Sequence, residues 1–299
     1  MFVIFGASGN AGSITAATLR QAGHAVRAVV RDARQGERLA KIGCEIALAD
    51  LTDYASVAKA IEGADAVQIL CPVPLADPHP ADTMRRMIET AARALRANPP
   101  PRVLALSDYG AELERDTGIT LLFHHMEEQL KPIASHLTLL RAAEHMQNWL
   151  RVMPAALKTG LLPSLHHPLD KRFASVSAHD VGRLAAALLV DHDPAGEKTP
   201  RIVSVEGPQR ISALDVAQTL TELSGREITA LELPRDEWTP MLLRAGLSAN
   251  HAQLITDLYD THNAGLIDVE AGAGEQRFGK TGLAEVFASI MPHVEAGAH

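Results

Sequence analysis

A chain of 299 residues can bury a large core, and 46% apolar with 21% charged residues is the composition of an ordinary globular protein. The 28 basic residues against 36 acidic ones give a formal charge of -8, which argues against nucleic acid or an anionic membrane as the main partner. Cys44 and Cys71 provide neither a disulfide framework nor metal-ligand spacing, so no metal is expected. Without a signal-peptide core or a membrane-length apolar run, we expect a cytoplasmic protein.

The opening stretch joins a short apolar segment, residues 2–5, to a glycine-rich turn and then to a helix-compatible stretch from Ser13. The glycines are spaced G-x-x-G-x-x-G. Gly6 allows the turn, Gly9 lets the backbone approach a diphosphate, and Gly12 lets the helix pack on the strand. A plain turn is the alternative, but a strand before the motif and a helix after it favour nucleotide binding. The expected diphosphate contacts are Gly6, Ala7, Ser8, Gly9, Asn10, Ala11 and Gly12.

Strands and helices then alternate regularly to residue 150, which predicts an α/β protein with a doubly wound Rossmann-type parallel sheet of strand order 3-2-1-4-5-6. The expected domains are a nucleotide-binding domain at 1–150 and a smaller, substrate-binding α/β lobe at 151–299, from which the chain is free to return to the sheet. The expected strands lie at 25–30, 44–49, 66–70, 102–107 and 137–141, and the helices at 13–22, 54–62 and 81–97.

The residue after the second strand distinguishes the two nicotinamide cofactors. An acidic side chain there binds the ribose 2′-OH of NAD, whereas an arginine neutralises the 2′-phosphate of NADP. This chain has Arg31, with Arg34 shortly after it. Asp32 is able to serve a 2′-OH, and a solvated basic loop is the alternative without a ligand. Because Arg31 comes first, we predict NADP (NADPH) as the cofactor.

Further cofactor contacts are expected where later strands end, since ligands bind at the carboxyl edge of such sheets. An adenine contact is expected just after the third strand, although helix capping also explains an aspartate there. The stiff loop at 71–74 would cover the nicotinamide-side ribose, with Cys71 as a small apolar filler rather than a nucleophile. These contacts are Asp50, Leu51, Leu70, Cys71, Pro72 and Ser107.

The second half of the chain is expected to close over the substrate. We predict a helix-like stretch at 142–149 and a loop at 157–168 in which His166 and His167 are solvated rather than metal-bound. Later helices are expected at 180–190, 212–224, 238–247 and 250–264, with strands at 201–206 and 228–233. Residues 274–281 match the P-loop pattern G-x-x-x-x-G-K-T, but no strand precedes them, so an NTPase is not expected.

Five segments together resemble the NmrA-like atypical short-chain dehydrogenase/reductases. They are the opening glycine motif, Val-Val-Arg-Asp at 29–32, Leu-Ser-Asp-Tyr-Gly-Ala-Glu at 106–112, Glu-Glu-Gln-Leu at 127–130 and Leu-Thr-Leu-Leu-Arg at 137–141. Residues 173–182 and 203–208 are similar to that family's C-terminal stretches. The resemblance implies an NADPH-dependent oxidoreductase that passes hydride directly to a small electron-poor aromatic acceptor of the quinone, azo or triphenylmethane type. The alternative is a non-catalytic NADP-binding redox sensor. A homodimer is compatible with the sequence, which does not determine the oligomeric state.

The Tyr-x-x-x-Lys pair of the family's classical relatives is absent, since Tyr109 is followed four residues later by Leu113. The position where NmrA-like reductases often carry lysine corresponds to Phe123, next to His124 and His125. We predict His124 as a catalytic proton donor, with a helix-capping role as the alternative. Tyr109 is predicted to contact the substrate, with simple packing over the loop as its alternative.

Overall fold

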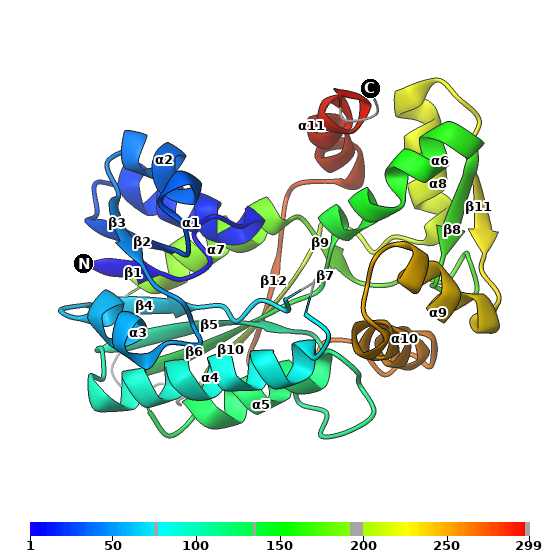
Figure 1. Cartoon of the computed structure of the whole chain (residues 1–299). Helices are drawn as coiled ribbons and strands as arrows, with labels where there is room; N and C mark the ends of the chain where they lie inside the picture. Colours follow the sequence, from blue (N-terminus) through cyan, green and yellow to red (C-terminus); the bar gives the residue numbers. More distant parts are fainter. Residues whose placement is uncertain (75–76, 134–135, 192–199, 297–299) are drawn as a thin grey trace.

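The computed structural model describes residues 1–74, 77–133, 136–191 and 200–296. Its main sheet has eight strands, all parallel, in the order β12-β10-β6-β5-β4-β1-β2-β3 (Figure 1). The predicted order 3-2-1-4-5-6 is confirmed, and two later strands extend the sheet beyond it. The strands are β1 Phe2–Ile4, β2 Val26–Val30, β3 Glu45–Leu48, β4 Ala66–Ile69, β5 Arg102–Asp108, β6 His136–Ala142, β10 Arg201–Glu206 and β12 Glu275–Phe278.

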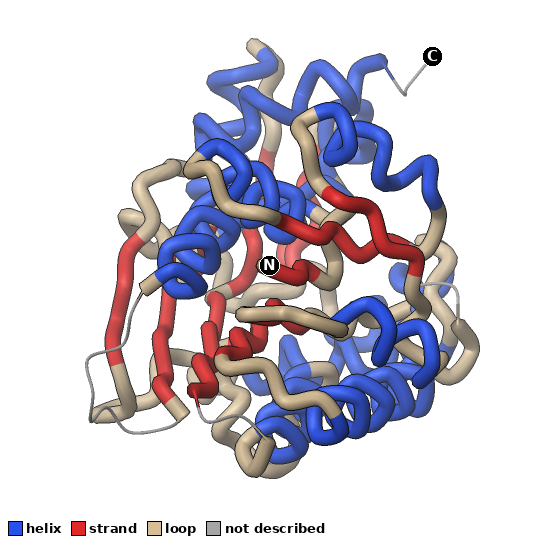
Figure 2. The backbone as a smooth tube through the Cα atoms, turned by 90° about the vertical axis from the view of Figure 1, so that its left-hand side faces the viewer, coloured by secondary structure: helices blue, strands red, loops and turns tan. Residues whose placement is uncertain are grey.

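Helices cover both faces of this sheet (Figures 1 and 2). One face carries α1 Asn10–Gln21, α2 Ala33–Lys41 and α7 Ala178–Val190, and the other α3 Tyr54–Ile61, α4 Pro80–Ala97 and α5 Thr120–Leu130. Each helix layer packs on one hydrophobic core. Strand β1 is apolar throughout because Ile4 packs into the first core, under α1, and Val3 into the second, under α4. A strand that is buried on both faces is a continuous apolar run in the sequence, without alternating polar residues.

Further elements of the second half lie at the right and top of Figure 1, where many of their buried side chains form a third core and a smaller fourth one. Short parallel pairs form between β8 and β11 and between β7 and β9. No helix in the described ranges is long and apolar enough to cross a membrane. The elements are β7 Glu144–His145, the 3₁₀ helix η1 Met146–Arg151, α6 Met153–Thr159, β8 Leu161–Ser164, β9 Ser175–Val176, α8 Ala213–Ser224, β11 Thr229–Glu232, α9 Arg235–Arg244, α10 Ala249–Asn263 and α11 Leu283–Ala296.

Several predicted elements differ from the observed ones. The helix expected at 142–149 is strand β7 followed by η1, and the loop expected at 157–168 contains the end of α6 and strand β8. Pro163 lies within β8. A proline has no N–H to donate and therefore predicts a loop, but β8 pairs with β11 in a two-stranded sheet, where an edge position tolerates it. The first helix starts at Asn10, three residues earlier than predicted, because Gly9 already serves as its N-cap.

Candidate active site

The glycine loop has the geometry that its sequence predicts. Gly6 has φ +70°, and a Cβ built on Gly12 would lie 2.2 Å from Gly6 O. Gly9 N donates to Gly6 O at 2.9 Å, which closes the turn. Gly9 is the N-cap of α1 and supplies no capping side chain, so the first N–H groups of α1 stay available for an anion. These residues fit the diphosphate of a dinucleotide.

The seven predicted loop residues divide by exposure. Ser8, Gly9 and Asn10 are exposed, whereas Ala7 and Ala11 are buried with Gly12. The buried members therefore offer only main-chain groups. Gly6 lies against the end of β4, since a Cβ on it would come within 2.9 Å of Leu70 Cδ2. The loops after β1 and β4 thus meet where the strand order of the sheet reverses, which is the ligand position of this fold.

Arg31 lies at the end of β2 as an exposed guanidinium for which no hydrogen bond or ion pair is found in the described part of the chain. Asp32, the side chain that would instead bind a ribose 2′-OH, already has hydrogen-bond partners in the protein. Its carboxylate caps α2 by accepting from Arg34 N at 2.9 Å and pairs with Arg34 Nη2 at 2.6 Å. These bonds lower the pKa of Asp32. Arg31 is therefore the cation left for a 2′-phosphate.

Asp50 follows β3 and lies near Arg31. It accepts from Thr52 N and Thr52 Oγ1, both at 2.8 Å, and these bonds lower its pKa, to which the charge of Arg31 adds. Asp50 is exposed and Leu51 is buried at its side. The adenine contact of Asp50 and Leu51 stays a prediction from the sequence.

The remaining predicted cofactor contacts lie past β4 and β5. Leu70 is half-buried and Pro72 is exposed, but Cys71 is fully buried, and burial raises the pKa of its thiol to about 12. Such a thiol is inert at neutral pH. Ser107 is also buried and donates to Glu127 Oε1 at 2.6 Å.

A buried ion pair fixes the edge of the sheet beside Ser107. Arg141 binds Glu127 through two bonds, Nε to Oε1 at 2.9 Å and Nη2 to Oε2 at 2.7 Å. Arg141 also binds Glu112 at 3.1 Å and Glu270. Removing one partner of such a pair costs about 3–5 kcal/mol, because the other charge is left buried. The network holds β5, α5 and β6 in one arrangement.

Tyr109 follows β5 and is 3% exposed. Its N donates to Ala142 O at 3.0 Å, and its phenol lies near Glu206 and Arg210, with burial as the main reason for a raised pKa. The hydroxyl group has no hydrogen-bond partner among the described residues. An orphaned buried hydroxyl is unusual in native proteins. Substrate contact and simple packing both stay open for Tyr109.

His124 and His125 point to different sides of α5, as the 100° between helix neighbours requires. His124 Nδ1 lies 2.9 Å from Ala111 O, whereas His125 Nε2 lies 4.0 Å from Glu89 on α4. Since a carbonyl only accepts, Nδ1 of His124 carries the hydrogen, and a neutral ring has none on Nε2. Only the protonated form of His124 offers a proton to the site.

The sequence analysis missed a buried group centred on Glu144. His166 Nε2 lies 2.9 Å from Glu144 Oε2, and the Tyr259 hydroxyl donates to Oε1 at 3.0 Å. Burial opposes ionisation of Glu144, but His166, then His262 and the Tyr259 hydroxyl outweigh it and lower its pKa to about 2. The prediction of a solvated His166 is wrong, since it is 3% exposed and stacks on Phe173 at 3.6 Å. No sequence spacing connects residues this far apart.

Asp108 is a second missed residue. It ends β5 between Ser107 and Tyr109, and its Oδ2 accepts from Thr120 Oγ1 at 2.9 Å. Burial raises the pKa of Asp108 to about 7 against the opposing bond from Thr120, and Glu144 adds to the rise. A carboxyl group that titrates near neutrality in a ligand-binding edge is a candidate acid or base.

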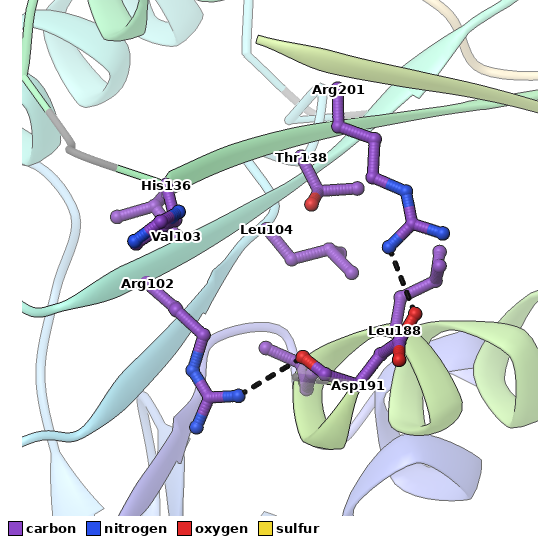
Figure 3. A pocket seen from close by; sticks show the side chains of 9 residues that line it. Arg102, Val103, Leu104, His136, Thr138, Leu188, Asp191 and Arg201 are labelled. Atoms are coloured by element: carbon purple, nitrogen blue, oxygen red, sulfur yellow. Dashed lines mark hydrogen bonds and ion pairs between the residues drawn. The ribbon is translucent and has the colours of Figure 1, made fainter. Parts of the chain in front are cut away.

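Two hollows of the structure lie at opposite ends of the parallel strands. A hollow of about 460 Å³ lies over the loop after β5, and Thr261 and Leu266 line it together with residues 112–117. A small pocket of about 20 Å³ lies at the amino ends of β5, β6 and β10, where Asp191 joins Arg102 and Arg201 (Figure 3). That pocket has room for about one water molecule and lies away from the cofactor edge.

The P-loop-like segment binds a carboxylate of its own chain. Lys280 N and Thr281 N donate to Asp180 Oδ2 at 2.8 and 2.7 Å, and Thr281 Oγ1 lies 3.0 Å from Oδ1. The residues between its glycines form the edge strand β12, so no phosphate loop exists here. No group of three or more His, Cys, Asp or Glu able to hold a metal is found within the residues the structure describes.

Two curated relatives align with most of the chain. One is the NAD(P)H azoreductase of Xenophilus azovorans, 24% identical over 260 residues, which cover 87% of this chain and 86% of that protein. The other is quinone oxidoreductase 2 of Escherichia coli, 25% identical over 262 residues and 86% of each chain.

Solved structures confirm the predicted fold. The structure of the Escherichia coli quinone oxidoreductase with NADPH has a TM-score of 0.78 at 22% identity, covering 97% of this chain and 100% of that one. The Citrobacter triphenylmethane reductase with NADP(H) also has a TM-score of 0.78, at 18% identity, covering 97% and 99%. The resemblance inferred from the sequence is confirmed by these matches together. A sequence profile described as NAD(P)H-binding matches residues 6–192, more than half of the chain, and the protein therefore belongs to this NAD(P)H-binding family.

Proposed function

We propose that the protein is an NADPH-dependent oxidoreductase that transfers hydride directly to a small electron-poor aromatic acceptor of the quinone, azo or triphenylmethane type. The observation that carries the cofactor part is the uncapped glycine loop together with Arg31 at the end of β2, whose guanidinium pairs with none of the described residues. Together they fit a diphosphate and a 2′-phosphate. The acceptor class follows from the relatives, one named for azo reduction and the other for quinone reduction.

Within this proposal, residues 1–150 bind the cofactor and residues 151–299 form most of the substrate lobe. NADPH, when bound, supplies the hydride. Support for the lobe comes from residues 261–270, which lie against the carboxyl edge of the sheet. Thr261 Oγ1 donates to Asp116 O at 2.6 Å, Glu270 pairs with Arg141, and a Cβ on Gly110 would lie 2.5 Å from Ile267 Cδ1.

We assign the following roles within this proposal. Arg31 binds the 2′-phosphate, the loop at 6–12 binds the diphosphate, and Tyr109 contacts the substrate. His124, in its protonated form, is the proton donor predicted from the sequence, and the structure offers the carboxyl group of Asp108 as a competing acid. A cytoplasmic location and a homodimer remain predictions from the sequence.

A non-catalytic NADP-binding sensor is the second candidate, favoured by the absence of the Tyr-x-x-x-Lys pair. The deciding experiment measures NADPH oxidation with a panel of quinones, azo dyes and triphenylmethane dyes, alongside NADPH binding by calorimetry. A reductase consumes NADPH with at least one acceptor class. Tight NADPH binding without any turnover supports the sensor, and no NADPH binding refutes both.

A further inference from the structure

We infer that Asp108 is the acid that delivers the proton accompanying hydride transfer, for acceptors whose reduced form is an oxygen or nitrogen anion. This inference rests on the proposed reductase function and names a catalytic residue for it. Quinones and azo compounds are such acceptors. A cationic triphenylmethane dye is not, because hydride addition to its central carbon gives a neutral product that needs no proton.

Position is the first argument. Asp108 is the last residue of β5 and pairs in register with Ala142 at the end of β6. Arg31 and Asp50 mark the adenine side of the glycine loop, at the ends of β2 and β3. A dinucleotide that crosses the loop from that side extends its nicotinamide toward the ends of β4 and β5. Asp108 is on that side, and it is partly exposed, whereas Ser107 and Tyr109 on either side of it are buried.

The charges around Asp108 are the second argument. Glu144 of β7 and Glu127 of α5 both act on its carboxyl group. Arg141 of β6 is bonded to Glu127, and His166 is bonded to Glu144, so the basic partners of both glutamates are already engaged with them. Like charges and burial favour the neutral carboxylic acid, which places the pKa of Asp108 at about 7.

The step balances as follows in atoms and electrons. The hydride brings two electrons and one hydrogen to the acceptor and leaves an oxygen or nitrogen anion on it. The O–H bond of Asp108 breaks, a new O–H or N–H bond forms on the acceptor, and the electron pair stays on Asp108 as a carboxylate. A proton from solvent restores the acid. The sum is NADPH, acceptor and one proton giving NADP and the reduced acceptor.

The first experiment compares two acceptors in one assay, a quinone that needs a proton and a triphenylmethane dye that does not. Asp108→Asn keeps an oxygen that accepts from Thr120 but removes the acidic proton. The ratio of the quinone rate to the dye rate should fall by about 10²-fold or more, within the range of general acid catalysis. His124→Ala should change this ratio less, and the reverse order would identify His124 as the donor and overturn the inference.

The rate of quinone reduction should depend on pH in the direction set by protonation of Asp108. The wild-type quinone rate should be retained below about pH 7, where Asp108 carries its proton, and fall as the pH rises above it. The dye rate should lack this fall. A quinone profile without an alkaline fall, or an Asp108→Asn variant with an unchanged ratio, refutes the inference and leaves the proposed function intact.

The second experiment needs no turnover. Protein labelled with ¹³C at aspartate carboxyl groups is titrated by NMR without cofactor, and Asp108→Asn assigns the resonance that titrates near pH 7. Glu144→Gln removes a like charge and should move that midpoint to lower pH. Tyr259→Phe is the matched control, because it removes one bond to Glu144 and keeps its charge. A midpoint in the ordinary range of aspartate overturns the inference. A wild-type protein that reduces neither acceptor overturns the proposed function and the inference with it.

Discussion

Two glycine-containing segments of this chain match nucleotide-binding patterns, and only the first one has the geometry for it. Residues 6–12 leave an interior strand and enter α1 with no side chain on the N-cap. Residues 274–281 contain the edge strand β12, and their N–H groups at Lys280 and Thr281 bind the carboxylate of Asp180. Both segments therefore present main-chain N–H groups that suit an anion. The difference is that the second anion belongs to the protein itself.

The lesson is that a glycine pattern specifies backbone freedom but not what occupies the space beside it. A Cβ on Gly12 would meet Gly6 O at 2.2 Å, and a Cβ on Gly279 would meet Asp180 Oδ2 at 2.5 Å. Close approach requires glycine in both places. In the first segment, the close approach of Gly12 to Gly6 packs α1 on β1, and no side chain of the N-cap binds the first N–H groups of α1. In the second segment, the close approach at Gly279 seats Asp180 of α7.

The largest effect is expected from Gly12→Ala. The added methyl group cannot fit beside Gly6 O without moving α1 off β1, so the free energy of unfolding should fall by about 3–5 kcal/mol. Urea denaturation measures this change, and NADPH binding should be lost with it. A stable Gly12→Ala variant would mean that the contact between helix and strand is looser than the structure shows.

Gly9→Ala is the matched control at the same loop. Its Cβ would lie 3.3 Å from Gly6 O, and its φ of -84° suits alanine. Stability should fall by less than about 1 kcal/mol, while NADPH affinity drops at least about tenfold because the methyl group occupies the diphosphate approach. Equal losses of binding and stability in both variants would contradict separate roles for the two glycines.

The second largest effect is expected from Asp180→Ala, which tests the other segment. It leaves the N–H groups of Lys280 and Thr281 and the Thr281 hydroxyl without their partner, which should cost about 2–4 kcal/mol of stability. Arg183→Ala is the control, because Arg183 pairs with Asp180 from an exposed position. NADPH affinity of the folded Asp180→Ala protein should stay near wild type. A large loss of affinity would show that the second segment contributes to the cofactor site.

Sequence reasoning was most successful where local rules decide the structure. Strand order, the glycine loop and helix α8 with its Ser212 and Asp215 capping box follow from apolar runs and caps. It failed at α2, whose buried residues are only Gly36 and Leu39, and at β12, which is largely exposed. Such elements have no clear apolar period. Their places are set by partners distant in the sequence.

The same limit applies to the site. Arg31 could be found because its role depends on the end of one strand. Asp108 lies in the segment 106–112, but its raised pKa depends first on burial and then on Glu144 and Glu127, which belong to other elements. The bonds of Glu144 to His166 and Tyr259 connect residues 22 and 115 positions away. When the groups around a side chain come from three separate elements, they are not at a fixed spacing in the sequence, and a motif cannot reveal them.

A smaller effect, confined to one cofactor, is expected from Arg31→Ala. Loss of a charged phosphate contact should weaken NADPH binding by about 1.5–3 kcal/mol, or about 10- to 150-fold. NADH affinity should change little, because NADH lacks the 2′-phosphate. Calorimetric titration with both cofactors measures the difference. Arg34→Ala is the control, since Arg34 is occupied by Asp32, and a loss as large as that of Arg31→Ala would move the phosphate site to α2.

The smallest effect is expected from Lys280→Ala, and it tests the second segment most directly. In a working P-loop the lysine reaches the β- and γ-phosphates, so its removal would abolish nucleotide binding. Here Lys280 is exposed, and only its main-chain N–H binds Asp180, a bond that alanine retains. Stability should change by less than about 0.5 kcal/mol, as for other surface substitutions. NADPH affinity should match that of the wild type, and neither protein should bind ATP. A lysine-dependent affinity for ATP would mean that the segment opens and releases Asp180 to admit a phosphate. Both glycine segments would then bind nucleotides, and Asp180 would control binding at the second one.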